Sequence, residues 1–390
     1  MKIAYIACWC KMRIYAIQTS HLKENIEKQL ENKIKLITSN CGCFYSNFKD
    51  AFTSLSNYEN LLTDTDVSFF KLPHFRYHAQ KSLASRLMRL AYRGLSEPLR
   101  GYYFAKHTKE FDIVHFHQSA DAFGYHALKY FLKFNNTSKK IVTIHSFSET
   151  QKEKPEVNSL YNLADAVITN TEYLKEKLTG WGVNEKKVHV VPYGSIITPP
   201  KNKPRSGAIM FAGSPLINVK GFEYLAPALK TLKDEGKHIQ LKLHGYYMPG
   251  HQEWAQEIAK KEGIEDLLIW LSCNSEDDLI DAYQGSMCSV IPYTDYSGAF
   301  PATMALGTGT PVIASDLMGI PEYVNGNGMV VKGKSVDELS TALRKMYTDD
   351  ALQTTMSQNA LKTANEKYSF SYIARKTTDI YKNVCSISRN

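Results

Sequence analysis

SVIPYTDYSGAFPATMALGTGTPVIASD, residues 289–316, predicts a strand, a loop, a helix, a tight turn and a second strand in succession. Ser289 to Pro292 is short and apolar, Asp295 to Gly298 is rich in turn formers, and Phe300 to Leu306 carries helix formers. A loop that leads into a helix at the carboxyl end of a strand suits anions, because unpaired N–H groups and the positive end of the helix dipole point outward there. The stretch is therefore a candidate phosphate-binding loop, although no acidic residue lies between Tyr296 and Gly309.

Length and composition predict a soluble protein of two domains. The 390 residues suit two α/β domains of ordinary size, and 43% hydrophobic with 22% charged residues is typical of globular proteins. The first apolar run, Met1 to Cys10, is too short for a signal peptide, and no stretch reaches the roughly 18 apolar residues of a membrane-spanning helix. We therefore expect a cytoplasmic protein with reduced cysteines.

Four of the seven cysteines form two Cys-x-Cys pairs, Cys8 with Cys10 and Cys41 with Cys43. Each pair ends a predicted strand, so that adjacent strands could bring four thiolates together around a metal ion. Small buried thiols are common in strands, however, and Cys-x-Cys is not the usual spacing of a zinc site. We favour core cysteines and expect no metal and no cofactor.

Short β-branched or aromatic runs alternate with helical stretches through two successive series. This pattern predicts two parallel sheets wrapped by helices, that is, two Rossmann-like doubly wound α/β domains. The strands are expected at 2–8, 34–39, 67–71, 113–116, 141–145, 166–170 and 188–192, and then at 208–212, 239–244, 268–271, 288–292, 312–314 and 329–331.

The domains are expected at 1–195 and 208–368, facing each other across a cleft. A linker at 196–207 contains three prolines among lysine and serine, a composition typical of an extended connection. Residues 369–390 follow the second sheet and contain a final helix, which we expect to pack back on the first domain.

Most of the net charge of +8 comes from one segment. Residues 76–109 contain eight lysines or arginines and a single acid. Arg86, Arg89 and Arg93 share one face of a predicted helix, and leucines occupy the adjacent face. Together with Arg100, they predict a surface that binds an anionic membrane; the alternative is a solvated helix packed on its own domain. Nucleic acid is not an expected partner, because no nucleic-acid-binding motif accompanies the charge.

A series of short motifs runs along most of the chain in a characteristic order. The first half contains Phe111-Asp-Ile-Val-His115-Phe-His117, Thr143-Ile-His145 and Val190-Val-Pro-Tyr-Gly194. The second half contains Phe211-Ala-Gly213, Lys220-Gly221, His244-Gly245 and Gly309-Thr-Pro-Val-Ile-Ala-Ser315. In this order the motifs resemble the retaining glycosyltransferase family 4, also called glycosyl transferases group 1. The resemblance implies the GT-B fold, with an acceptor-binding first domain and a second domain that binds a nucleotide-sugar donor.

The resemblance also implies roles for individual residues. Lys220 matches the family lysine that contacts the diphosphate, and His145 matches the histidine that contacts the donor sugar, so these two are the catalytic candidates. The expected donor-binding residues are Gly213, Ser214, Lys220, Gly221, Gly245, Leu271, Ser272, Cys273, Asn274, Asp295, Tyr296, Ser297, Gly298, Ala299, Phe300 and Met304. Further candidates for contacts with the diphosphate or the acceptor are Lys11, Arg13 and His117.

The chain departs from the family where the ribose and the donor sugar are expected. The two family glutamates fall at Tyr296 and Met304, and Ser214 stands near the position of a family arginine. A methionine cannot accept two hydrogen bonds from ribose hydroxyls, so we expect backbone amides and hydroxyls to hold the donor. Ala7 to Arg13 also lacks the glycine pair that the family often has after its first strand.

The resemblance implies transfer of a sugar from a UDP- or GDP-linked donor to a hydroxyl acceptor, with retention of configuration and without a metal. We expect a role in cell-surface polysaccharide or glycolipid assembly, with a sugar or lipid-linked acceptor and a location at the inner face of the membrane. The first alternative is a catalytically silent GT-B subunit or glycan-binding partner of another transferase, which the loss of both glutamates would allow. The second is another GT-B chemistry, namely sugar epimerisation or phosphorolysis.

Overall fold

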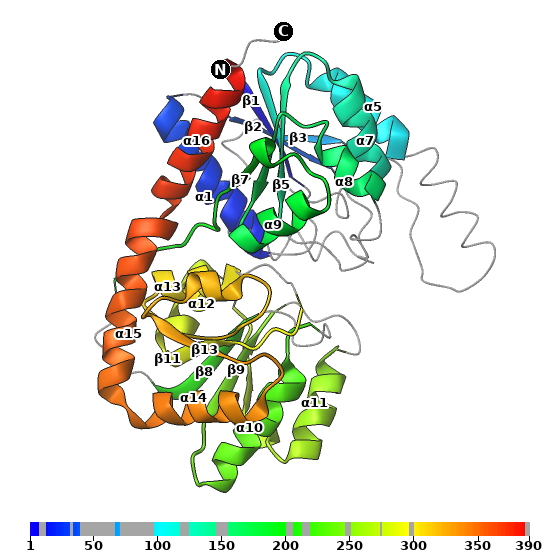
Figure 1. Ribbon diagram of the computed structural model, residues 1–390. Helices are drawn as coiled ribbons and strands as arrows, with labels where there is room; N and C mark the ends of the chain where they lie inside the picture. The colour runs from blue at the N-terminus through cyan, green and yellow to red at the C-terminus, as the bar shows by residue number, and fades with distance from the viewer. Residues whose placement is uncertain are drawn as a thin grey trace, which may run out of the picture. The chain divides into compact units, whose positions relative to one another are not determined.

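The chain forms two compact units, each built on a parallel sheet against which helices pack (Figure 1). The computed structural model describes residues 1–7, 13–31, 34–39, 67–70, 97–117, 125–145, 155–199, 206–212, 219–245, 251–273, 275–295 and 300–386. The first unit comprises Met1–Pro192 and Ala374–Asn390, and the second comprises Tyr193–Ile373. The prediction of two parallel-sheet, Rossmann-like α/β domains is thereby confirmed.

The first unit contains a sheet with the strand order β3-β2-β1-β4-β5-β6-β7, in which all neighbours pair in parallel. Its strands are β1 (Ile3–Ala7), β2 (Ile34–Ser39), β3 (Val67–Phe70), β4 (Ile113–Phe116), β5 (Lys139–Ile144), β6 (Ala166–Thr169) and β7 (Val188–Val190). Its described helices are α1 (Arg13–Leu30), α5 (Glu97–His107), α7 (Tyr125–Phe134), α8 (Pro155–Tyr161), α9 (Glu172–Gly180) and the 3-10 turn η4 (Glu185–Lys187). The strand order reverses between β1 and β4, because β2 and β3 lie on the far side of β1.

The second unit contains a parallel sheet with the order β10-β9-β8-β11-β12-β13. Its strands are β8 (Ser206–Ala212), β9 (Gln240–His244), β10 (Leu268–Trp270), β11 (Ser286–Ile291), β12 (Val312–Ser315) and β13 (Gly328–Val331). Its described helices are α10 (Phe222–Asp234), α11 (His251–Glu262), α12 (Glu276–Gln284), α13 (Phe300–Gly307), α14 (Val336–Thr348) and α15 (Asp350–Thr363). Shorter turns are η5 (Glu265–Leu267), η6 (Ile320–Tyr323) and the π-helical η7 (Ala364–Tyr368).

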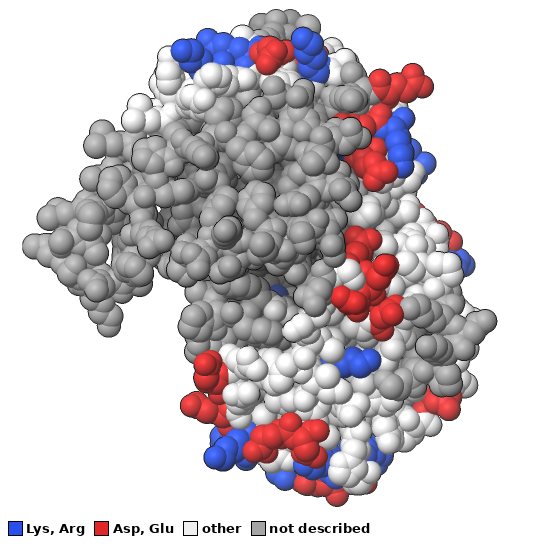
Figure 2. Space-filling view, turned by 180° about the vertical axis from the view of Figure 1, so that it is seen from behind, with Lys and Arg blue, Asp and Glu red and all other residues white. Residues whose placement is uncertain are grey.

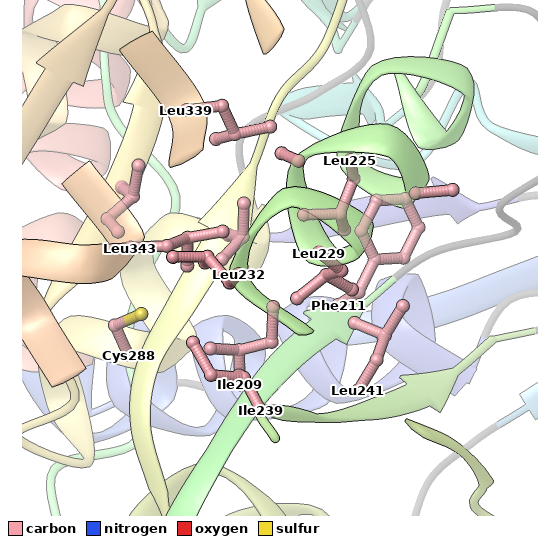
Figure 3. Close-up of a cluster of buried hydrophobic side chains, with 14 of the residues drawn as sticks. Ile209, Phe211, Leu225, Leu229, Leu232, Ile239, Leu241, Cys288, Leu339 and Leu343 are labelled. Atoms are coloured by element: carbon pink, nitrogen blue, oxygen red, sulfur yellow. The ribbon is translucent and has the colours of Figure 1, made fainter. Parts of the chain in front are cut away.

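Both sheets follow the alternation seen in the sequence. Each strand predicted from the β-branched and aromatic runs is present, and its ends differ from the prediction by at most two residues. The buried strands read as nearly continuous apolar runs because helices cover both faces of a parallel sheet. In the second unit, Ile209 and Phe211 of β8 pack with Leu225, Leu229 and Leu343 in one hydrophobic core (Figure 3).

The last helix, α16 (Phe370–Ser386), leaves the second unit and becomes part of the first at Ala374. Within the first unit the hydroxyl of Tyr381 lies 2.7 Å from Nδ1 of His115 in β4, and Thr378 Oγ1 donates to Gln29 Oε1 of α1 at 3.2 Å. A buried tyrosine needs a partner for its hydroxyl, so the His115 contact fixes where α16 lies along the sheet.

The chain passes from the first unit to the second a few residues earlier than the linker expected at 196–207. Ser195 is already hydrogen bonded inside the second unit, with its backbone N donating to Tyr368 O at 2.7 Å and its hydroxyl donating to Thr303 O at 2.5 Å. These bonds place the boundary before Tyr193. Residues 200–205 lie outside the described part of the chain.

Two predictions concern residues that the structure does not describe. The paired cysteines Cys8, Cys10, Cys41 and Cys43 lie outside the described residues, so their roles stay predictions. The same holds for the arginines Arg86, Arg89 and Arg93, whereas Arg100 lies in α5 without a described side chain.

Candidate functional site

The candidate donor site lies at the carboxyl edge of the second sheet. Because all its strands are parallel, the segments that follow β8, β9, β10 and β11 meet at one edge. The strand order reverses between β8 and β11, since the chain first moves from β8 toward β10 and then crosses to β11. In open α/β sheets the crevice at such a reversal is where ligands bind.

Lys220 and Gly221 lie at this reversal, directly before α10. Gly221 has a φ of +73°, a left-handed conformation that favours glycine, and a Cβ there would overlap the carbonyl of Pro292. Thr294 N donates to Val219 O at 2.9 Å, which ties the segment before α10 to the end of β11. Gly221 has no side chain to cap the helix, and the first N–H groups of α10 and the positive end of its dipole lie at this end of the helix, beside Lys220.

Lys220 is almost entirely buried at this position. Its side chain is 6% exposed, and its Nζ lies 3.8 Å from the centroid of the Tyr293 ring. Burial lowers the pKa of Lys220 from its ordinary value near 10.5 to about 7, because the ammonium loses hydration. An amine with this pKa gains a proton readily beside an anion, which suits it to a diphosphate.

The chain after β11 leads into α13, a helix whose residues are all buried. Asp295 is half-buried at the end of the described loop, whereas all eight residues of α13, including Phe300 and Met304, are buried. The side chain of Met304 is therefore buried. Tyr296, Ser297, Gly298 and Ala299 lie outside the described residues.

The ends of β9 and β10 lie beside each other, since Leu271 N donates to Leu243 O at 2.9 Å. Gly245 and Leu271 are half-buried, Ser272 is exposed and Cys273 is buried. These residues lie along the edge that also carries Lys220. Gly213, Ser214 and Asn274, which were predicted to join them, are outside the part of the chain that is described.

The first unit brings His117 and His145 together at the ends of β4 and β5. His145 Nε2 lies 3.3 Å from His117 Nδ1 and 3.2 Å from His117 O. Because a carbonyl oxygen can only accept, His145 carries its proton on Nε2, and its Nδ1 holds the lone pair. Of the basic candidates after β1, Lys11 is not described, and Arg13 begins α1 without a described side chain.

Three buried histidines at β4 and at the ends of β4 and β5, namely His115, His117 and His145, are neutral at pH 7. Burial lowers the pKa of His145 to about 3 and that of His117 to about 4, and it lowers the pKa of His115 well below its ordinary value. A neutral imidazole can exchange hydrogen bonds with a sugar hydroxyl but offers no full positive charge to a phosphate. The neutral His145 thus suits a hydroxyl ligand, and Lys220 suits an anion.

Two contacts of the site region have no signature in the sequence. Tyr293 follows β11 and faces Lys220, and His115 bonds through its two ring nitrogens to Thr143 and Tyr381 at 2.7 Å each. In both cases the partners are far apart along the chain, so no local spacing predicts the contact. Within the described residues no group of three or more His, Cys, Asp or Glu side chains could hold a metal ion.

Comparison with known proteins agrees with this arrangement. The family model for glycosyl transferases group 1 matches residues 197–363, and that for glycosyltransferase family 4 matches residues 64–195. The chain belongs to the GT-B glycosyltransferases. The first match contains Lys220 and Asp295 of the second unit, and the second contains His117 and His145 of the first.

The chain is similar in sequence to an MMP alpha-(1->4)-mannosyltransferase of Mycolicibacterium hassiacum, with 26% identity over 211 residues. The alignment covers 53% of this chain and 50% of that protein, so the chain spans about half the length of the curated relatives it matches. Its fold is that of sucrose-phosphate synthase from Thermosynechococcus elongatus, with a TM-score of 0.73, 16% identity and full coverage of both chains. It is also that of Anabaena HepE in complex with UDP and glucose, with a TM-score of 0.70, 17% identity and coverage of 98% of this chain and 100% of that one.

The buried ammonium of Lys220 predicts that Lys220→Met stabilises the second unit below pH 7. Between about pH 7 and 10.5 the unfolded state holds a proton that the folded state has lost, so stability of the wild type rises with pH across that window. Lys220→Met lacks this dependence. We expect its free energy of unfolding to exceed that of the wild type by on the order of 1–3 kcal/mol at pH 6, with the difference shrinking toward pH 10.

Urea unfolding from pH 6 to 10 measures this difference. Lys362→Met, which removes an exposed lysine in α15 of the same unit, is the matched control and should change stability little at any pH. A difference for Lys220→Met that stays constant from pH 6 to 10 would contradict the lowered pKa.

Proposed function

We propose that this chain transfers a sugar from a nucleotide-diphosphate sugar to a hydroxyl acceptor. The observation that carries the proposal is Lys220, a buried amine with a pKa near 7 at the reversal of the second sheet, next to the uncapped start of α10. This combination suits the diphosphate that leaves when the sugar is transferred. The relative that is named a mannosyltransferase and the solved relative that binds UDP and glucose support the same chemistry.

We infer a retaining reaction that needs no metal ion. The bond between the sugar and the diphosphate breaks, the acceptor oxygen bonds to the same face of the sugar, and the acceptor proton passes to the departing phosphate oxygen. Lys220 and the first N–H groups of α10 stabilise the negative charge on that phosphate, and His145 orients the sugar by a hydrogen bond. The donor is a UDP- or GDP-sugar.

Lys220→Ala should lower kcat by at least about 100-fold while the protein stays folded, because the leaving diphosphate loses its cationic partner. A screen of UDP- and GDP-sugars against hydroxyl acceptors identifies the substrate pair, and steady-state kinetics then measures the variant. The exposed Lys362→Ala is the control and should keep wild-type rates. Sugar transfer at the wild-type rate by Lys220→Ala would refute the proposed role.

A catalytically silent GT-B subunit is the second candidate. It is favoured by Met304, which stands where the resemblance places a family glutamate. Met304 is wholly buried, and its side chain has no oxygen that could bind the ribose. The two candidates differ in ligand binding. Calorimetry with UDP and GDP separates them, because an active transferase must bind one of these nucleotides and a silent subunit should bind neither.

We further propose that the chain works at an anionic membrane in polysaccharide or glycolipid assembly, on a sugar or lipid-linked acceptor. Among the described residues, α5 and α7 expose Leu99, Tyr102 and Phe134, with relative exposures of 65%, 53% and 47%. The exposed lysines Lys106 and Lys133 lie on the same two helices. On the face seen in Figure 2, lysines and arginines of the described residues are interspersed with acidic side chains. No helix among the described residues is long and apolar enough to cross a bilayer.

Apolar side chains beside lysines suit shallow insertion at anionic headgroups. The double variant Leu99→Ser with Tyr102→Ser should therefore sediment with phosphatidylglycerol vesicles at low salt several-fold less than the wild type. Tyr347→Ser, at a similarly exposed tyrosine of the second unit, is the control and should sediment like the wild type. If the wild type itself stays in the supernatant with these vesicles, the membrane proposal is wrong.

A further inference from the structure

Tyr293 and Lys220 form a buried pair at the end of β11. The amine of Lys220 lies 3.8 Å from the centroid of the Tyr293 ring, and the two side chains are 6% and 1% exposed. A cation over an aromatic face is attracted by the ring quadrupole, and more strongly when water is excluded. The ring thus gives the buried ammonium a favourable contact at a place where loss of hydration penalises it.

Tyr293 is itself held in place from several strands. Its carbonyl accepts a hydrogen bond from Ser315 Oγ of β12 at 2.7 Å, and its hydroxyl donates to Ala212 O at the end of β8 at 3.4 Å. The next residue, Thr294, donates its N–H to Val219 O, beside Lys220. Tyr293 is therefore tied to the ends of β8 and β12 and to the segment before α10, and its ring can fix the lysine in turn.

We propose that Tyr293 is a positioning residue for Lys220, whose ammonium it holds at the reversal between β8 and β11 so that the ammonium meets the donor diphosphate. The proposal rests on the proposed function, because the diphosphate is that of the donor. The face of the ring is the part that meets the lysine, since the amine lies over the ring and the bond from the hydroxyl to Ala212 O is long, at 3.4 Å. Tyr293→Phe keeps that face, and Tyr293→Leu removes it.

Calorimetry with UDP and GDP, using whichever the wild type binds, tests the role. Tyr293→Leu should bind that nucleotide about 10-fold or more weakly, and Tyr293→Phe should stay within about twofold of the wild type. Tyr323→Leu removes a buried tyrosine ring in the same unit, where it packs on Tyr368, and should also stay within about twofold. If Tyr293→Leu does not fold, Tyr293→Met, with a flexible apolar side chain of similar reach, carries the same test.

A second readout needs no ligand. In protein labelled with ¹³C-lysine, the side-chain methylene signals of Lys220, identified by their loss in Lys220→Arg, should be shifted upfield by the ring in the wild type and in Tyr293→Phe. In Tyr293→Leu they should return to ordinary positions.

Unshifted signals in the wild type, or wild-type nucleotide affinity in Tyr293→Leu, would overturn the positioning role alone. If the wild type binds neither nucleotide, the proposed function is wrong, and so is the role of Tyr293 toward a diphosphate. The lysine signals still decide whether the contact between Tyr293 and Lys220 exists.

Discussion

The close approach of Gly221 to the carbonyl of Pro292 is the contact on which the rest of the donor site depends. Any side chain at position 221 would collide with that carbonyl, and the left-handed backbone there also favours glycine. This approach lets α10 start directly beside the end of β11, with Thr294 bonded to Val219. Lys220 precedes this glycine and is buried, with its amine 3.8 Å from the centroid of the Tyr293 ring.

The burial of Lys220 opposes stability and, in the proposed reaction, serves binding of the diphosphate. A pKa near 7 means that the surrounding protein favours the neutral amine by several pKa units relative to water. In the proposed reaction that free energy is recovered when the diphosphate enters, because its negative charge favours the ammonium. Burial has a different consequence for His145 of the first unit, because it keeps the imidazole neutral. A neutral imidazole suits a hydroxyl, which is bound by an oriented hydrogen bond and not by a charge.

The sequence predicted both sheets and the position of Lys220, because these follow from local patterns. β-branched runs separated by amphipathic helices specify a parallel sheet, and a lysine before a glycine at a helix start needs no tertiary information to be noticed. It did not predict the ring of Tyr293 over that lysine, since residues 220 and 293 meet only through the pairing of β8 with β11. The hydrogen bonds of Ser195, which move the boundary ahead of the expected linker, are likewise long-range.

The packing of α13 agrees with a methionine at its centre, where the sequence resemblance places a family glutamate. Every residue of the helix is buried, and its polar side chain, Thr303, is satisfied by the carbonyls of Gly194 and Phe300 at 3.2 and 3.1 Å. A glutamate at position 304 in this setting would bury a carboxylate without water, a change that is strongly unfavourable unless a partner is supplied. A helix packed so deeply can offer a ligand only its N-terminal backbone. In the proposed transferase, the described residues that remain to hold the donor are therefore Lys220, the strand ends around it and the N-terminal backbone of α13.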